Sequence, residues 1–155
     1  RLEGTMRTFD ESTRRDIQRR VRQTTESIAS SAGTTATVQI DDGNPVTHND
    51  VALTQQMLPT LQRVAGAANV QLAELSMPAE DFSHYQKKIP GFFFFLGIVP
   101  KGADAAKAPR NHSPLFFADE SALPLGVRVL SNMALDWLAA HSSDTRVSPT
   151  GQPRR

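Results

Sequence analysis

The stretch "RLEGTMRTFDESTRRDIQRRVRQTTESIASSAGTTATVQI", residues 1–40, decides the expected fold. Residues 1–9 are predicted to form a short strand. Asp10 then stands where its carboxylate can cap the N-terminus of a long helix that ends at Gly33. Residues 34–40 alternate apolar and polar side chains, as in a half-buried strand. Strand, helix and strand form a crossover unit whose two strands share one sheet, so we predict an α/β fold.

The predicted helix carries one narrow apolar stripe. The stripe consists of Ile17, Val21, Thr24 and Ile28. The other faces hold five arginines, at positions 14, 15, 19, 20 and 22, which are offset by acidic neighbours. We therefore interpret this cluster as a solvated helix face and expect no nucleic-acid partner.

Residues 41–50, "DDGNPVTHND", are dense in turn-forming residues and read as a domain junction. A second helix is predicted after Asp50, with Leu53, Met57, Leu61 and Val64 on its apolar face. Residues 70–75 are predicted to form a short strand. Residues 92–98, "FFFFLGI", lack polar alternation and are expected to form a strand covered on both faces.

The last predicted helix spans about residues 120–140. Its predicted buried side consists of Leu123, Val127, Leu130, Ala134, Trp137 and Leu138. Residues 141–155 have little apolar content and are expected to be a disordered tail.

The composition excludes some classes of protein. The chain has 155 residues, a formal net charge of +1 and no cysteine. Charge alone therefore indicates no partner, and neither a disulfide nor a thiolate metal site is available. No apolar run reaches the ~18 residues of a membrane-spanning helix, so we expect no membrane association.

Four stretches of the sequence together resemble one family. They are "GTMRTFD" (4–10), "GNPVTHND" (43–50), "AEDFSHY…PGFFFFLG" (79–97) and "NHSPLFFADESALPLG" (111–126). In this order and spacing they resemble the C-terminal half of the aminoacylase/carboxypeptidase family of dinuclear metallohydrolases. The most similar branch contains hippurate hydrolase and the N-acyl-amino-acid amidohydrolases.

The resemblance implies a fold in two domains, with a ferredoxin-like lid inserted into an α/β catalytic domain. Residues 1–44 would then be the C-terminal part of the lid or dimerisation domain. Residues 45–140 would be the closing part of the catalytic domain, followed by the tail at 141–155. The part of the family fold that supplies most metal ligands and the catalytic glutamate would precede Arg1.

The resemblance also implies the chemistry. The whole protein is expected to hydrolyse the amide bond of N-acyl amino acids or small peptides with a metal-activated water. A complete site would hold two divalent ions of zinc, manganese or cobalt. The expected partner is a second copy bound through the lid domain, or else the N-terminal half of the family fold.

Two residues carry over from the family's motifs. His112, in "NHSP", matches the last metal-binding histidine, and a neutral imidazole suits a divalent ion. By residue type alone it would instead be a loop histidine. Asn49 matches a junction asparagine near the substrate, where its amide N–H could hold a carboxylate or an oxyanion. Its alternative role is only to shape a turn with Asp50.

Other polar residues in the four stretches receive no catalytic role. His48 stands where relatives more often carry an apolar residue and is assigned no role, with a second-site metal ligand or an oxyanion donor as the open alternatives. For Glu80 and Asp81 we expect that one organises the start of a short helix and the other supports the active-site loops. Pro78 replaces a usual glycine, so the local backbone is expected to differ there.

A non-catalytic protein is the alternative interpretation, because one recognisable ligand cannot hold two metals. The chain would then be a truncated fragment or a dimerisation module. The compartment is not determined by the sequence. The loop "PKGADAAKAPRNHSP" (100–114) resembles exported bacterial members, which favours the periplasm slightly over the cytoplasm.

Overall fold

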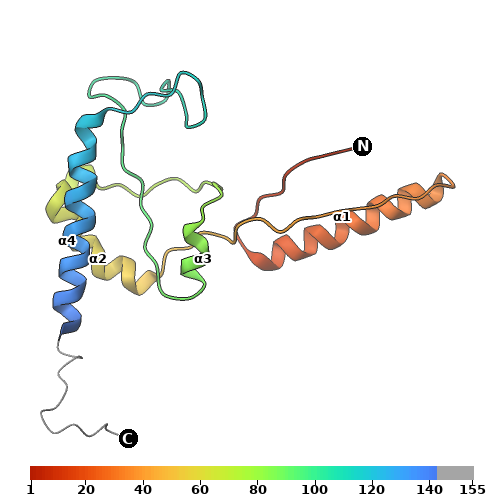
Figure 1. The fold of residues 1–155 in the computed structure, drawn as a ribbon, viewed down its shortest axis with the longest axis horizontal. Coiled ribbons are helices and arrows are strands. Elements are labelled where there is room, and N and C mark those ends of the chain that lie inside the picture. Colours follow the sequence, from red (N-terminus) through yellow and green to blue (C-terminus); the bar gives the residue numbers. More distant parts are fainter. Residues whose placement is uncertain (143–155) are drawn as a thin grey trace, which may run out of the picture. The chain divides into compact units, whose positions relative to one another are not determined.

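The computed structural model describes residues 1–142. In this range the regular elements are all helical (Figure 1). They are α1 (Glu11–Ser31), α2 (Val51–Ala65), the 3-10 helix η1 (Ala67–Asn69), α3 (Phe82–Gln86), the 3-10 helix η2 (Glu120–Ala122) and α4 (Leu123–His141). Of the tail predicted at 141–155, His141 ends α4 and residues from 143 onward lie outside the described residues.

The four predicted strands, at 1–9, 34–40, 70–75 and 92–98, do not form within residues 1–142. Strand propensity does not make a strand; backbone N–H and C=O groups must pair with a neighbouring strand. The described residues offer these segments no such ladder. The strand predictions were therefore wrong for this chain as described, and the sheet of the predicted α/β and ferredoxin-like architecture is not confirmed.

The chain divides into two compact units. The first consists of residues 1–50 and 74–93, and the second of residues 51–73 and 94–155. The domain bounds predicted at residues 44 and 140 refer to the complete family fold and stay a prediction.

In the first unit, α1 begins and ends as the sequence indicates. Asp10 is extended, and its carboxylate accepts hydrogen bonds from the Thr13 N–H at 2.7 Å and the Ser12 hydroxyl at 2.6 Å. These bonds, that of Ser12 first, lower the pKa of Asp10 to about 2. At the other end Gly33 has φ +68°, and the Thr34 N–H reaches the Ala29 carbonyl at 3.0 Å. This is a Schellman cap, in which glycine takes the left-handed conformation without steric cost.

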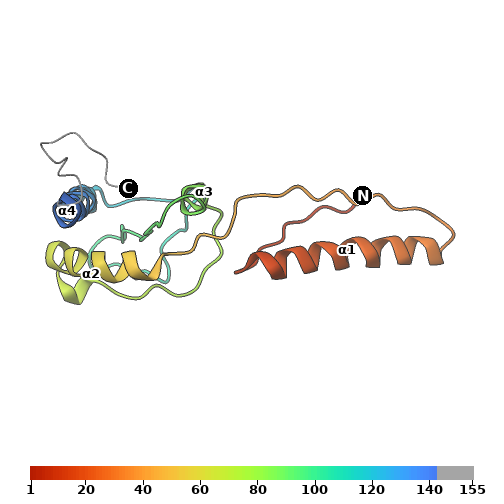
Figure 2. The same cartoon turned by 90° about the horizontal axis from the view of Figure 1, so that it is seen from below.

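The apolar stripe of α1 is not covered by a packed layer. No residue of α1 is buried, and Ile28 is 65% exposed. Residues 34–42 run along the helix as an extended segment (Figures 1 and 2). A cavity of about 1100 Å³ lies between the helix stripe and the extended segments of the first unit, lined by Met6, Ile17, Val21, Val38 and Ile40 among others.

In the second unit, α2 packs against α4 (Figures 1 and 2). The buried apolar residues are Met57 of α2 with Val129 and Met133 of α4. Buried Thr60 donates to the Asp136 carboxylate at 2.5 Å, and Arg63 binds the same carboxylate oxygen at 2.6 Å. On the predicted inner face of α2, Met57 is buried, whereas Leu53, Leu61 and Val64 are half-buried.

The buried side predicted for α4 was wrong. Val127, Leu130 and Leu138 are 65%, 60% and 56% exposed. The side that meets α2 instead carries Val129 and Met133, four residues apart. This helix is apolar on two sides, so periodicity alone could not identify which side faces α2.

No helix within residues 1–142 is both long enough and apolar enough to span a lipid bilayer.

Candidate functional site

His112 occupies a tight turn in the second unit. The Ser113 N–H donates to the Arg110 carbonyl at 3.1 Å, which closes a four-residue turn with His112 in its third position. His112 has φ +69°, the left-handed conformation, and is the one non-glycine residue with positive φ among residues 1–142. Glycine is favoured at this turn position, so the backbone holds the histidine there at a steric cost.

The residues after His112 extend this turn. The Ser113 hydroxyl accepts from the Leu115 N–H at 3.2 Å, and the Ser113 carbonyl accepts from the Phe116 N–H at 3.0 Å. His112 itself is exposed, and its ring has no hydrogen-bond partner among the described residues. A turn of this kind fixes the backbone that carries the exposed imidazole. One accessible nitrogen can ligate a divalent ion.

The described residues contain no group of three or more histidine, cysteine, aspartate or glutamate side chains that could together hold a metal ion. His112 is the candidate donor that the sequence motif identifies, and its place in a metal site stays a prediction.

Asn49 lies in the first unit and is bound to the backbone of Phe93. Its side-chain Nδ2 donates to the Phe93 carbonyl at 2.7 Å, and its Oδ1 accepts from the Phe93 N–H at 2.8 Å. The Asp50 N–H donates to the Gly91 carbonyl at 2.9 Å. Asn49 thus anchors the predicted domain junction to the phenylalanine-rich segment. One N–H of its Nδ2 has no hydrogen-bond partner within residues 1–142.

Asp81 and Glu80 act around the start of α3. The Asp81 carboxylate accepts from the Asn44 amide at 2.9 Å. The Glu80 carbonyl, rather than its carboxylate, accepts from the Ser83 hydroxyl at 2.6 Å. His84 Nε2 lies 3.2 Å from the Asn44 Oδ1. Neither carboxylate caps α3, and the roles expected for Glu80 and Asp81 stay a prediction.

Sequence reasoning missed Gln86, which contacts the backbone of His48 and the side chain of Asn49. The available signal was a glutamine at the end of a short helix followed by Pro90 and Gly91. A Cβ on Gly91 would lie 2.6 Å from the Gln86 Cγ, so a glycine at position 91 leaves room for this glutamine.

Asp119 caps the 3-10 helix η2, which leads directly into α4. Its carboxylate accepts from the Ser121 N–H at 2.9 Å. Hydrogen bonds from Ser121, that of its side chain first and that of its backbone second, lower the pKa of Asp119. The Asp119 N–H donates to the Ile98 carbonyl at 2.9 Å. Asp119 is therefore a structural residue of the second unit.

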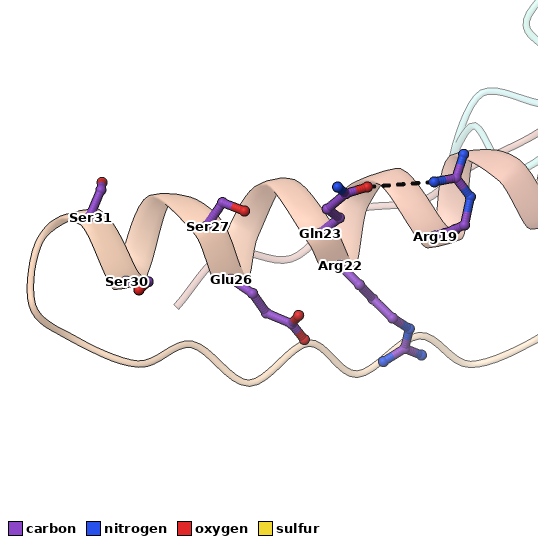
Figure 3. Close-up of a pocket in the computed structure, with 7 residues that line it drawn as sticks. All are labelled: Arg19, Arg22, Gln23, Glu26, Ser27, Ser30 and Ser31. Carbon is purple, nitrogen blue, oxygen red and sulfur yellow. Dashed lines mark hydrogen bonds between the residues drawn. The ribbon is translucent and has the colours of Figure 1, made fainter.

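The arginine face of α1 is largely engaged within the chain. Arg19 and Arg20 bind Asp16 at 2.5 and 2.6 Å and lower its pKa, and Arg22 donates to the Val38 carbonyl at 2.6 Å. A cavity of about 730 Å³ on this helix is lined by the polar side chains drawn in Figure 3, including Arg22 and Glu26. Apart from the two arginines, the lining side chains carry hydroxyl, amide or carboxylate groups. Paired charges suit a solvated face better than a phosphate-binding one.

Comparison with known proteins places these observations in a family. Residues 6–136 match the model described as Peptidase family M20/M25/M40. The chain is 31% identical over 135 residues to thermostable carboxypeptidase 2 of Saccharolobus solfataricus, with 86% of this chain covered. It is 32% identical over 146 residues to an IAA-amino acid hydrolase of Arabidopsis thaliana, with 92% covered. It is 34% identical over 123 residues to N-acetyldiaminopimelate deacetylase of Enterococcus faecalis, with 77% covered.

The chain spans about a third of the length of these relatives, 33%, 33% and 32% respectively. This share is smaller than the half that the sequence motifs predicted.

Proposed function

Because the chain belongs to peptidase family M20/M25/M40, we propose that its whole protein is a metal-dependent amidohydrolase. The substrate is an N-acyl amino acid or a small peptide, cleaved at an amide bond next to a free carboxylate. The names of the three relatives, a carboxypeptidase, an IAA-amino acid hydrolase and an N-acetyldiaminopimelate deacetylase, support a substrate derived from an amino acid.

The observation that carries this proposal is the conformation of His112. His112 is held at φ +69°, and within residues 1–142 its exposed imidazole makes no packing contact or hydrogen bond that would offset the steric cost of this conformation. Strained backbone of this kind concentrates at functional sites. Among the described residues, this left-handed backbone lies in the motif "NHSP", which resembles the family's metal-binding turn.

His112 would hold one of two divalent ions through a ring nitrogen, and Asn49 would hold the substrate carboxylate through its remaining amide N–H. When bound, the metal pair supplies a water of lowered pKa and polarises the scissile carbonyl. The amide of Asn49 is neutral and fixed by Phe93, so it can select a carboxylate without a competing charge of its own.

A second candidate function is a non-catalytic dimerisation module. It is favoured by the uncovered apolar side of α1. In this alternative a second copy pairs with the extended segments at 1–9 and 34–40. The self-association would appear in light scattering or analytical ultracentrifugation at micromolar concentration, and a stable monomer would count against it.

The two functions are separated by assaying this chain and a polypeptide of full family length side by side. Hippurate and N-acetyl amino acids would be offered with added zinc, manganese or cobalt. We expect turnover from the longer polypeptide and none above background from the 155-residue chain. An inactive full-length polypeptide that binds these metals would contradict the hydrolase proposal.

A further inference from the structure

Asn49 is held by more than the backbone of Phe93. Its Oδ1 also lies 3.4 Å from the Nε2 of Gln86, which is the last residue of α3. The Oε1 of Gln86 accepts from the His48 N–H at 3.1 Å, and its Nε2 lies 3.5 Å from the Gly91 carbonyl. We name this arrangement the Asn49 clamp: the side chains of Asn49 and Gln86 with the backbone of His48, Gly91 and Phe93.

The clamp settles which end of the Asn49 amide faces which group. The Phe93 N–H can only donate, so the atom opposite it at 2.8 Å is the amide oxygen. The Phe93 carbonyl can only accept, so the atom opposite it at 2.7 Å is the amide nitrogen. If the amide were reversed, its NH₂ group would face the Phe93 N–H and its oxygen would face the Phe93 carbonyl, so neither hydrogen bond could form. Gln86 adds a second donor to the same oxygen and so favours the same orientation.

This geometry also determines what Asn49 can offer to a ligand. Its oxygen receives two donors, and one N–H of the nitrogen is used by Phe93. The group that remains is one N–H donor, which suits an anionic acceptor such as a carboxylate. The clamp therefore leaves Asn49 as a donor rather than an acceptor.

We propose that Gln86 is a positioning residue that fixes the amide of Asn49 with a single N–H left for a ligand carboxylate. The orientation is a property of this chain. Only the use of that N–H for a substrate carboxylate rests on the proposed function.

Amide hydrogen exchange followed by NMR on the full chain tests the orientation. In Gln86→Leu, which keeps the bulk but removes both polar ends, exchange at the His48 and Phe93 amides should rise about two- to tenfold, as expected for the loss of a hydrogen bond. Gln86→Glu can still accept from His48 but cannot donate to Asn49. Here exchange at His48 should stay low and exchange at Phe93 should rise.

The matched control is Gln55→Leu, at an exposed position of α2, which should change neither amide. If Gln86→Leu disrupts the fold in circular dichroism, Gln86→Glu decides. Unchanged exchange at Phe93 in the folded Gln86 variants would overturn the positioning role, whatever the His48 amide does.

Hippurate titration separates this inference from the proposed function. In the parent chain the Asn49 side-chain NH₂ resonances should shift on addition of hippurate, and in Gln86→Leu the shift should shrink. If the exchange results follow the prediction and hippurate moves nothing, the positioning role stands and the substrate role of Asn49 falls.

Discussion

Replacing His112 by glycine and by alanine tests whether its turn is strained. In the left-handed conformation a residue with a Cβ is penalised by about 1–2 kcal/mol relative to glycine. Glycine in turn costs about 0.4–1 kcal/mol through the greater entropy of the unfolded chain. With φ at +69°, the first effect exceeds the second. We expect His112→Gly to be more stable than His112→Ala by about 0.5–1 kcal/mol, from the difference of these two effects.

The adjacent Asn111 is the matched control, because it is also exposed but does not have positive φ. There the order should reverse, with alanine more stable than glycine by about 0.4–1 kcal/mol. The assay is urea denaturation of the four variants, followed by the helical signal and compared at the transition midpoints. If glycine is no better than alanine at position 112, or if both positions rank the same way, the strain argument for a functional His112 fails.

Three further outcomes follow from the packing and capping described above. Met133→Ala should cost about 2–3 kcal/mol of unfolding free energy, whereas Leu130→Ala, on the exposed side of α4, should stay within about 0.5 kcal/mol in the same urea titration. Because the pKa of Asp10 is lowered from 3.8 to about 2, its ionised cap stabilises α1 fully at pH values above 3.8 and is lost as the pH falls toward about 2. The helical signal should therefore decline between these pH values, and Asp10→Asn should abolish this pH-dependent decline. Gly91→Ala should raise exchange at the clamp amides because its Cβ would overlap the glutamine side chain, whereas Gly97→Ala, with open space around its Cβ, should leave them unchanged.

The helices were largely predictable because their signals are local. The Asp10 cap, the Gly33 stop and the inner face of α2 each depend on residues within one or two turns of sequence. The strands were not predictable in the same way, since a strand depends on a partner elsewhere in the chain. Residues 92–98 illustrate this. Their composition is that of a buried strand, yet the side chain of Asn49 binds the backbone N–H and C=O of Phe93.

The candidate site residues show the same difference between local and long-range signals. The "NHSP" motif pointed to His112, but its left-handed backbone follows from the closed turn and not from the residue type. Asn49 was identified by its motif, whereas its anchoring role depends on Phe93, 44 residues away in sequence. Gln86 was missed because a single glutamine carries no periodic or spacing signal.

The division of the chain into two units has a consequence for how its parts can be separated. The backbone passes between the units three times, at residues 50–51, 73–74 and 93–94, so both units are discontinuous in sequence. Neither unit can be transplanted into another protein as one continuous cassette. A single proteolytic cut in the exposed stretch at 71–79 would remove one of the three links and leave two intact. Such a nicked chain should therefore stay together in native gel filtration and separate into fragments only on denaturation.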